Sequence, residues 1–147
     1  MLKGIDPILT PDLLMRLCAM GHGEWVALVD ANFTAQSLAG NKPVIRLPGL
    51  GLERVCKAVL SVFPLDQAVP QPVAYMHHGG KPANYRTGAQ KAVAALLAKQ
   101  GTGNQQIEAV GRFAFYERTR AASLIVQTGE LTAFGNVLLA KGVLLQG

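Results

Sequence analysis

The chain has 147 residues, of which half are hydrophobic and 16% are charged, and its net charge is +5. This composition indicates a globular protein of one domain and excludes an intrinsically disordered chain. No apolar run approaches the roughly 20 residues of a membrane-spanning helix, and the lysines and arginines are too scattered for the basic stripe that nucleic-acid binding requires.

The first 30 residues predict a helix followed by a buried strand. Residues 1–7 contain an acid and a proline where a signal peptide has an apolar core, so we expect a cytoplasmic location. Thr10 and Pro11 are typical of a helix start, because a hydroxyl caps the first turn and proline fits the first helical position. Gly21 ends this helix, and the apolar run from Trp25 to Val29 predicts the strand.

His22 and Asp30 flank this strand and are the first candidate functional residues. The glycines on both sides of His22 leave its imidazole uncrowded, and Asp30 follows the strand end, where open α/β sheets bind ligands. We expect the two side chains to lie at one edge of the sheet and to form a small polar active site. The alternatives are a structural or surface role for His22 and a turn cap for Asp30.

Helices and short apolar strands alternate along the rest of the chain. The expected elements are a turn or short helix over 31–38, helices over 52–63, 88–99 and 113–122, and strands over 44–47, 72–76, 107–110 and 123–127 and around 137–145. This alternation predicts a single three-layer α/β/α domain over residues 1–147, with a mostly parallel sheet covered on both faces.

Two polar motifs lie in the last third of the chain. In the run from Gly111 to Arg118, a helix places Phe113 and Tyr116 on one side and Arg112 elsewhere. Aromatic packing with a solvated ionic face is one interpretation, and binding of ligand hydroxyls by the guanidinium and the phenol is the other. The tripeptide Phe134-Gly135-Asn136 is first of all a turn, but its asparagine can also donate to and accept from a sugar hydroxyl.

Other motifs carry weaker signals. Cys18 and Cys56 lack CxxC spacing and are expected to be buried free thiols. The glycines of Gly49-Leu50-Gly51 supply only part of a dinucleotide-binding fingerprint. His77 and His78 point to opposite faces of an extended segment and have no third ligand at suitable spacing, so we predict no metal site.

Taken as a set and in order, these motifs resemble the L-fucose mutarotase and D-ribose pyranase (FucU/RbsD) family over nearly the whole chain. The run from Arg112 to Arg118 points to the fucose mutarotase branch. The segments that carry the resemblance are Met1-Leu2-Lys3-Gly4-Ile5, Met20-Gly21-His22-Gly23, Asp30-Ala31-Asn32-Phe33, Gly111-Arg112-Phe113-Ala114-Phe115-Tyr116-Glu117-Arg118, Thr128-Gly129-Glu130 and Gly135-Asn136-Val137-Leu138-Leu139.

The resemblance implies interconversion of the α and β anomers of a monosaccharide, without cofactor or metal. It implies that His22 is the proton donor and that Asp30, Arg112 and the tripeptide Phe134-Gly135-Asn136 bind the substrate. Ring opening needs a proton removed from the anomeric hydroxyl and one given to the ring oxygen, which suits a histidine with a second acid, for which Tyr116 is a candidate. The family also forms decamers of two five-membered rings, in which a neighbouring subunit completes each site.

Two departures leave the sugar open. The family usually has tyrosine where this chain has Phe134, and the segment over 75–103 differs from the known fucose enzymes. The alternatives are therefore a pyranose–furanose isomerase for another sugar such as ribose, and a sugar-binding protein without catalytic activity.

Overall fold

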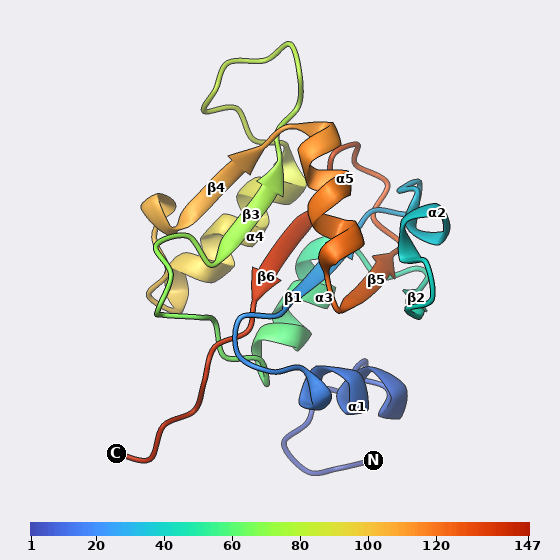
Figure 1. The fold of residues 1–147 in the computed structure, drawn as a ribbon, viewed down its shortest axis with the longest axis vertical. Helices are drawn as coiled ribbons and strands as arrows, with labels where there is room; N and C mark the ends of the chain where they lie inside the picture. The colour runs from blue at the N-terminus through green and yellow to red at the C-terminus, as the bar shows by residue number, and fades with distance from the viewer.

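A computed structural model of residues 1–147 shows a six-stranded sheet with the order β2-β5-β1-β6-β3-β4 (Figure 1). The central strand β6 runs antiparallel to both of its neighbours, and the other five strands run parallel to one another. The mostly parallel sheet predicted from the sequence is thus confirmed. The strands are β1 (Trp25–Val29), β2 (Val44–Leu47), β3 (Val73–Met76), β4 (Ile107–Val110), β5 (Leu124–Thr128) and β6 (Val137–Ala140).

Helices cover both faces of the sheet, which gives the predicted three layers. Alternate strand residues belong to two separate apolar clusters, as expected when successive side chains point to opposite faces. The larger cluster of 24 residues packs under α1, α3 and α4, and the cluster of 13 residues packs under α2 and α5. The helices are α1 (Pro11–Ala19), α2 (Ala35–Ala39), α3 (Leu52–Leu60), α4 (Gly88–Lys99) and α5 (Arg112–Ala121), with a short 3-10 turn at Asn104–Gln106.

Two helix starts follow from local capping chemistry. The Thr10 hydroxyl accepts from the N–H of Leu13 at 3.2 Å, so α1 begins at the predicted proline. At α4, the Thr87 hydroxyl accepts from the N–H of Gln90 and the Gln90 side chain accepts from the N–H of Thr87. None of the helices combines the length and hydropathy that crossing a bilayer requires.

Two sequence predictions are wrong in detail. β6 ends at Ala140, and the three apolar residues that follow Gly142 are exposed instead of continuing a strand. Leu139 and Ala140 pair with the first residues of the antiparallel neighbours β3 and β1, so neither strand has a residue left to pair with the segment that follows. Cys18 is exposed because it follows the inward-facing Leu17 by one helical position. Cys56 is buried as expected, and its burial raises the pKa of its thiol to about 12.

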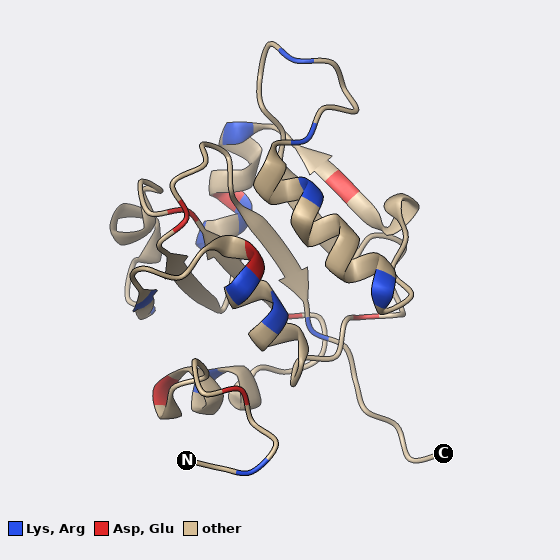
Figure 2. Cartoon of the chain, turned by 180° about the vertical axis from the view of Figure 1, so that it is seen from behind, with Lys and Arg blue, Asp and Glu red and all other residues tan.

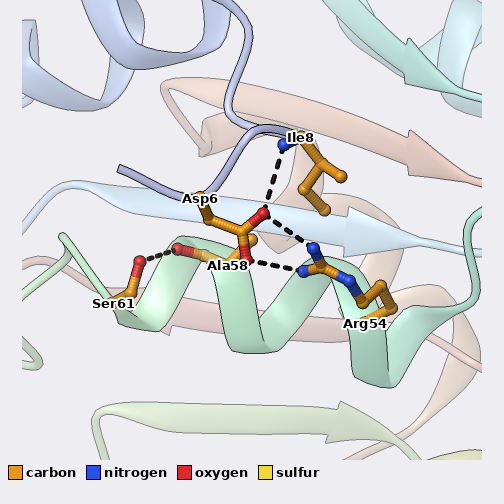
Figure 3. A network of polar contacts seen from close by, with 5 residues as sticks. All are labelled: Asp6, Ile8, Arg54, Ala58 and Ser61. Carbon is orange, nitrogen blue, oxygen red and sulfur yellow. Dashed lines mark hydrogen bonds and ion pairs between the residues drawn. The ribbon is translucent and has the colours of Figure 1, made fainter. Parts of the chain in front are cut away.

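The segment before α1 is tied to α3 by a bidentate ion pair (Figure 3). The two terminal nitrogens of Arg54 donate to the two carboxylate oxygens of Asp6, each at 2.7 Å, and the N–H of Ile8 donates to the same carboxylate at 3.1 Å. These donors hold the pKa of Asp6 below its ordinary value. Elsewhere, Lys and Arg are spread over helices, loops and the N-terminal segment (Figure 2).

Candidate functional site

The candidate site lies at the upper edge of the sheet in Figure 1, from which the loop of residues 77–87 projects. The five parallel strands all end at this edge, and β6 begins there. Ligands of open α/β sheets bind at the carboxyl ends of the strands. A pocket of about 210 Å³ opens at this edge and is lined by five of the predicted site residues, Asp30, Arg112, Tyr116, Phe134 and Asn136.

Asp30 supplies the buried carboxylate of the pocket. It follows β1 directly, is 7% exposed, and its Oδ1 accepts from the N–H of Asn32 at 2.9 Å. Its own N–H donates to Oδ1 of Asn136 at 2.8 Å, so the end of β1 is joined to the start of β6. Burial raises the pKa of Asp30, and the hydrogen bonds from Asn32 and Asn136 offset this only in part.

Arg112 and Tyr116 form a pair on the first turns of α5. Nε of Arg112 donates to the Tyr116 hydroxyl at 2.8 Å, and the guanidinium lies 5.5 Å from the centre of the ring. The expectation that Arg112 lies apart from Tyr116 is wrong, because residues four apart share one face of a helix. Phe115 is fully buried and fixes α5 on the sheet, whereas Phe113 is exposed.

The tripeptide Phe134-Gly135-Asn136 forms a tight turn that leads into β6. Phe134 has a φ of 62° and is the only residue other than glycine with a positive φ. Glycine is required at position 135 because neighbouring atoms leave no room for a side chain. A Cβ atom there would lie 2.8 Å from Cγ of Glu130 and 3.0 Å from the carbonyl oxygen of Thr132. Asn136 is 2% exposed, and its Nδ2 contacts Sδ of Met76 at 3.7 Å.

His22 lies at the opposite edge of the sheet, so the expectation that it shares an edge with Asp30 is wrong. It precedes β1 whereas Asp30 follows it, and the five residues of this strand span about 17 Å. Next to it, the N–H of Gly23 donates to the carbonyl of Lys141, just beyond the end of β6. The error came from treating nearness in sequence as nearness in space across an extended strand.

At its own edge His22 is paired with Asp66, a residue that the sequence analysis did not single out. Nε2 of His22 lies 3.0 Å from Oδ1 of Asp66, and the side chains are 48% and 4% exposed respectively. The N–H of Ala68 and the His22 ring lower the pKa of Asp66. A buried carboxylate therefore orients a half-exposed imidazole.

Three other residues near the pocket were also missed. The buried amide of Gln90 contacts the backbone of Phe134. The carboxylate of Glu130 accepts from the N–H groups of Leu52 and Thr132. The ring of His78 stacks on Phe134, with ring centroids 4.2 Å apart and an angle of 28°. Apart from the contact between Glu130 and Thr132, these contacts join segments far apart in sequence, so no local motif could have signalled them.

His77 and the glycines of residues 49–51 have local structural contacts. Nε2 of His77 lies 2.8 Å from the carbonyl oxygen of Pro82, which holds the base of the 77–87 loop. The carbonyl of Leu50 accepts from the N–H of Gly129, so the glycine-containing segment packs against the loop that follows β5.

The volume of a cavity does not by itself identify the site. A larger groove of about 480 Å³ lies between the N-terminal segment and α1, but most of its lining residues are apolar. Its one carboxylate, Asp6, is already paired with Arg54. The smaller pocket instead places a carboxylate, a guanidinium, a phenol and an amide around one opening, which suits a small ligand with several hydroxyl groups.

Comparison with known proteins gives matches along nearly the whole chain. Residues 3–144 match the RbsD / FucU transport protein family. The chain is 40% identical over 145 residues to the L-fucose mutarotase of Glaesserella parasuis, and the alignment covers 97% of this chain and 96% of that protein. It is 39% identical over 148 residues to the fucose mutarotase of Homo sapiens, with 97% and 94% covered. The crystal structure of the fucose mutarotase from Streptococcus pneumoniae in complex with L-fucose has a TM-score of 0.89 at 33% identity and covers 98% of this chain and 100% of that one.

Proposed function

Because the chain belongs to the RbsD / FucU family, we propose that it is a mutarotase that interconverts the α and β anomers of L-fucose. The observation that carries this proposal is the pocket at the carboxyl edge of the sheet, where Asp30, Arg112 and Asn136 surround a space of about 210 Å³. That pocket occurs in a chain about 40% identical to an L-fucose mutarotase.

The pocket residues suit the two proton transfers of the reaction. Opening the hemiacetal ring removes the proton of the anomeric hydroxyl and adds one to the ring oxygen, and closing the ring reverses both steps. The carboxylate of Asp30 accepts from sugar hydroxyls, the amide of Asn136 donates to them, and the guanidinium of Arg112 also donates to them. The hydroxyl of Tyr116 accepts from Arg112 and keeps its own proton to donate, which supports its role as second acid.

We assign the first proton donor to His22 of a second copy of the chain. Within one chain the strand β1 separates His22 from the pocket, whereas the His22 side chain is half exposed at its own edge. In a ring, the His22 edge of one copy can meet the pocket edge of the next, which brings His22 to the pocket of its neighbour. The apolar side chains of Phe113 and Leu131 are exposed at the pocket edge, and such a contact would cover them. A decamer of two such rings and a cytoplasmic location stay predictions from the sequence.

Exchange NMR tests the activity directly. One anomeric proton of L-fucose is saturated, with and without the protein, and the signal of the other anomer is observed. We expect saturation transfer only when the protein is present, since a well-placed acid and base accelerate such a step by about 10²- to 10⁴-fold. Absence of transfer with L-fucose and its presence with ribose would make the protein a pyranose–furanose isomerase, and broadened lines without transfer for every sugar would make it a binding protein.

Mixing two impaired variants tests whether His22 acts in a second copy. His22→Ala removes the proton donor, and Asp30→Asn weakens the pocket. If the site contains groups from two copies, dissociation and reassembly of a 1:1 mixture restores about one intact site in four, and the activity rises above that of either variant alone. If each chain carries its own complete site, the activity of the mixture stays at the mean of its two components.

A further inference from the structure

We propose that Gln90 is a positioning residue for the sugar site, acting through the backbone of Phe134. The inference rests on the proposed mutarotase function. It concerns a residue on α4, the helix that covers the face of the sheet opposite to α5 with its Arg112 and Tyr116.

The amide of Gln90 forms hydrogen bonds with three backbone groups. It is 2% exposed. Its Oε1 accepts from the N–H of Thr87 at 2.9 Å, and its Nε2 donates to the carbonyl of Met76 at 2.7 Å and to the carbonyl of Phe134 at 2.6 Å. One amide group therefore joins three segments, which are the start of α4, the end of β3 and the turn that precedes β6.

The turn at Phe134 depends on such support, because a residue with a Cβ atom is disfavoured at a positive φ. The carbonyl of Phe134 accepts from Gln90 and also from the N–H of Asn136 at 2.8 Å, and the carbonyl of Asn136 accepts from the N–H of Met76 at 3.1 Å. The position of the Phe134 carbonyl is thereby linked to that of Asn136, and Oδ1 of Asn136 accepts from the N–H of Asp30. Gln90 thus fixes the relative positions of two substrate-binding side chains without reaching the pocket itself.

A role confined to capping α4 is the competing interpretation, and two variants separate the two roles. Gln90→Glu keeps an oxygen that accepts from the N–H of Thr87 but loses the Nε2 donor and places a carboxylate against two carbonyls. Thr87→Ala removes the hydroxyl that caps the N–H of Gln90 and leaves the Nε2 contacts in place. If the buried carboxylate of Gln90→Glu prevents folding, Gln90→Leu replaces it, because leucine removes the Nε2 donor without adding a charge.

The experiment measures kcat and KM by exchange NMR with L-fucose, together with the amide resonance of Gly135 in a ¹H–¹⁵N spectrum. We expect Gln90→Glu and Gln90→Leu to lower kcat/KM by about 10- to 100-fold, mainly through KM because the binding groups are displaced, and to shift the Gly135 resonance. Thr87→Ala is expected to keep the wild-type kcat/KM and the wild-type Gly135 resonance.

Equal kinetic effects of the Gln90 and Thr87 variants, or an unmoved Gly135 resonance in Gln90→Leu, would overturn the positioning role. Failure of the proposed function has a different signature. In that case the wild-type protein exchanges no sugar anomers, and the Gly135 resonance still reports whether Gln90 positions the turn.

Discussion

Asp30 lies in the candidate pocket, where burial of its carboxylate disfavours the charged form. Its carboxylate is buried at the end of β1, and burial raises its pKa above the ordinary value of 3.8. An acid with a raised pKa in the folded state favours folding when protonated, so its contribution to stability is lost as the pH rises through that pKa. Its place in the candidate pocket therefore lowers stability at neutral pH.

We expect Asp30→Asn to be more stable than the wild type at pH 7 and to lose this advantage below about pH 4, where both side chains are neutral. The same change is expected to weaken sugar binding by about 10- to 100-fold, because a hydrogen bond to a charged group contributes about 1.5–3 kcal/mol. Thermal unfolding followed by circular dichroism between pH 3 and 7 checks the first outcome, and a sugar titration checks the second. A variant less stable than the wild type at pH 7 would contradict this account.

His78 is expected to act on the pocket through Phe134. Stacked aromatic rings contribute about 0.5–1.5 kcal/mol beyond burial, so His78→Ala frees the Phe134 ring and raises KM by up to about tenfold with little change in kcat. His77→Ala is the matched control, since this ring contacts only the carbonyl of Pro82 among the polar groups near it. A fall in kcat together with a lost limb of the pH profile would instead make His78 a proton donor.

The sequence predicted five of the residues that line the pocket, but not the position of His22 or the contact of Gln90 with the Phe134 turn. Asp30 was predicted from its position at a strand end and Asn136 from its amide and the family resemblance, and both line the same pocket. His22 was placed at the wrong edge because two residues that flank a strand were treated as neighbours, although the length of β1 separates them. Gln90 was missed because its contact with Phe134 joins positions 44 residues apart.

At the scale of elements, the start of α3 depends on a side chain from another part of the chain. Its N-cap is Gly51, which offers no side-chain acceptor, and Oε2 of Glu130 accepts from the N–H of Leu52 instead at 3.1 Å. Oε1 of the same carboxylate accepts from the N–H of Thr132 at 2.9 Å. Burial alone would raise the pKa of Glu130, but these donors outweigh it and the pKa lies below its ordinary value.

Glu130→Gln is expected to lower the free energy of unfolding by about 1 kcal/mol at pH 7, because an amide offers one acceptor oxygen where the carboxylate offers two. A lowered folded-state pKa stabilises above the ordinary value of 4.5, and this stabilisation is lost as the pH falls through the folded-state pKa. The difference between wild type and variant should therefore disappear in acid. Urea unfolding at pH 7 and pH 3 measures both values, and an unchanged difference at pH 3 would show that the charge is not responsible.

The helices and most strands were predicted well, whereas the end of the last strand and the exposure of Cys18 were not. α1 and α4 begin where hydroxyl caps stand in the sequence, and α4 has the predicted bounds of residues 88–99. The strand after residue 140 was predicted from apolar residues, but pairing decides the length of a strand, and β6 is already paired with the first residues of β1 and β3 at Ala140 and Leu139. The exposure of Cys18 likewise follows from which face of α1 meets the sheet.

At the scale of the whole molecule, the proposed pairing of His22 with the pocket of a second copy predicts that activity depends on assembly. We expect the specific activity per chain to fall on dilution in parallel with the fraction of assembled protein. Sedimentation velocity and exchange NMR over the same concentration range check this. Constant activity per chain in samples that sediment as monomers would show that one chain suffices.

The position of β6 has a consequence for biosynthesis. Before this strand is in place, β2-β5-β1 and β3-β4 are two separate half-sheets with no ladder between them. β6 follows the other five strands in the chain and is therefore the last of the six to leave the ribosome. A nascent chain holds two unjoined sheet edges until this strand has been synthesised, and only its insertion brings Asn136 beside Asp30. The candidate pocket and the continuous sheet are thus completed in the same folding step.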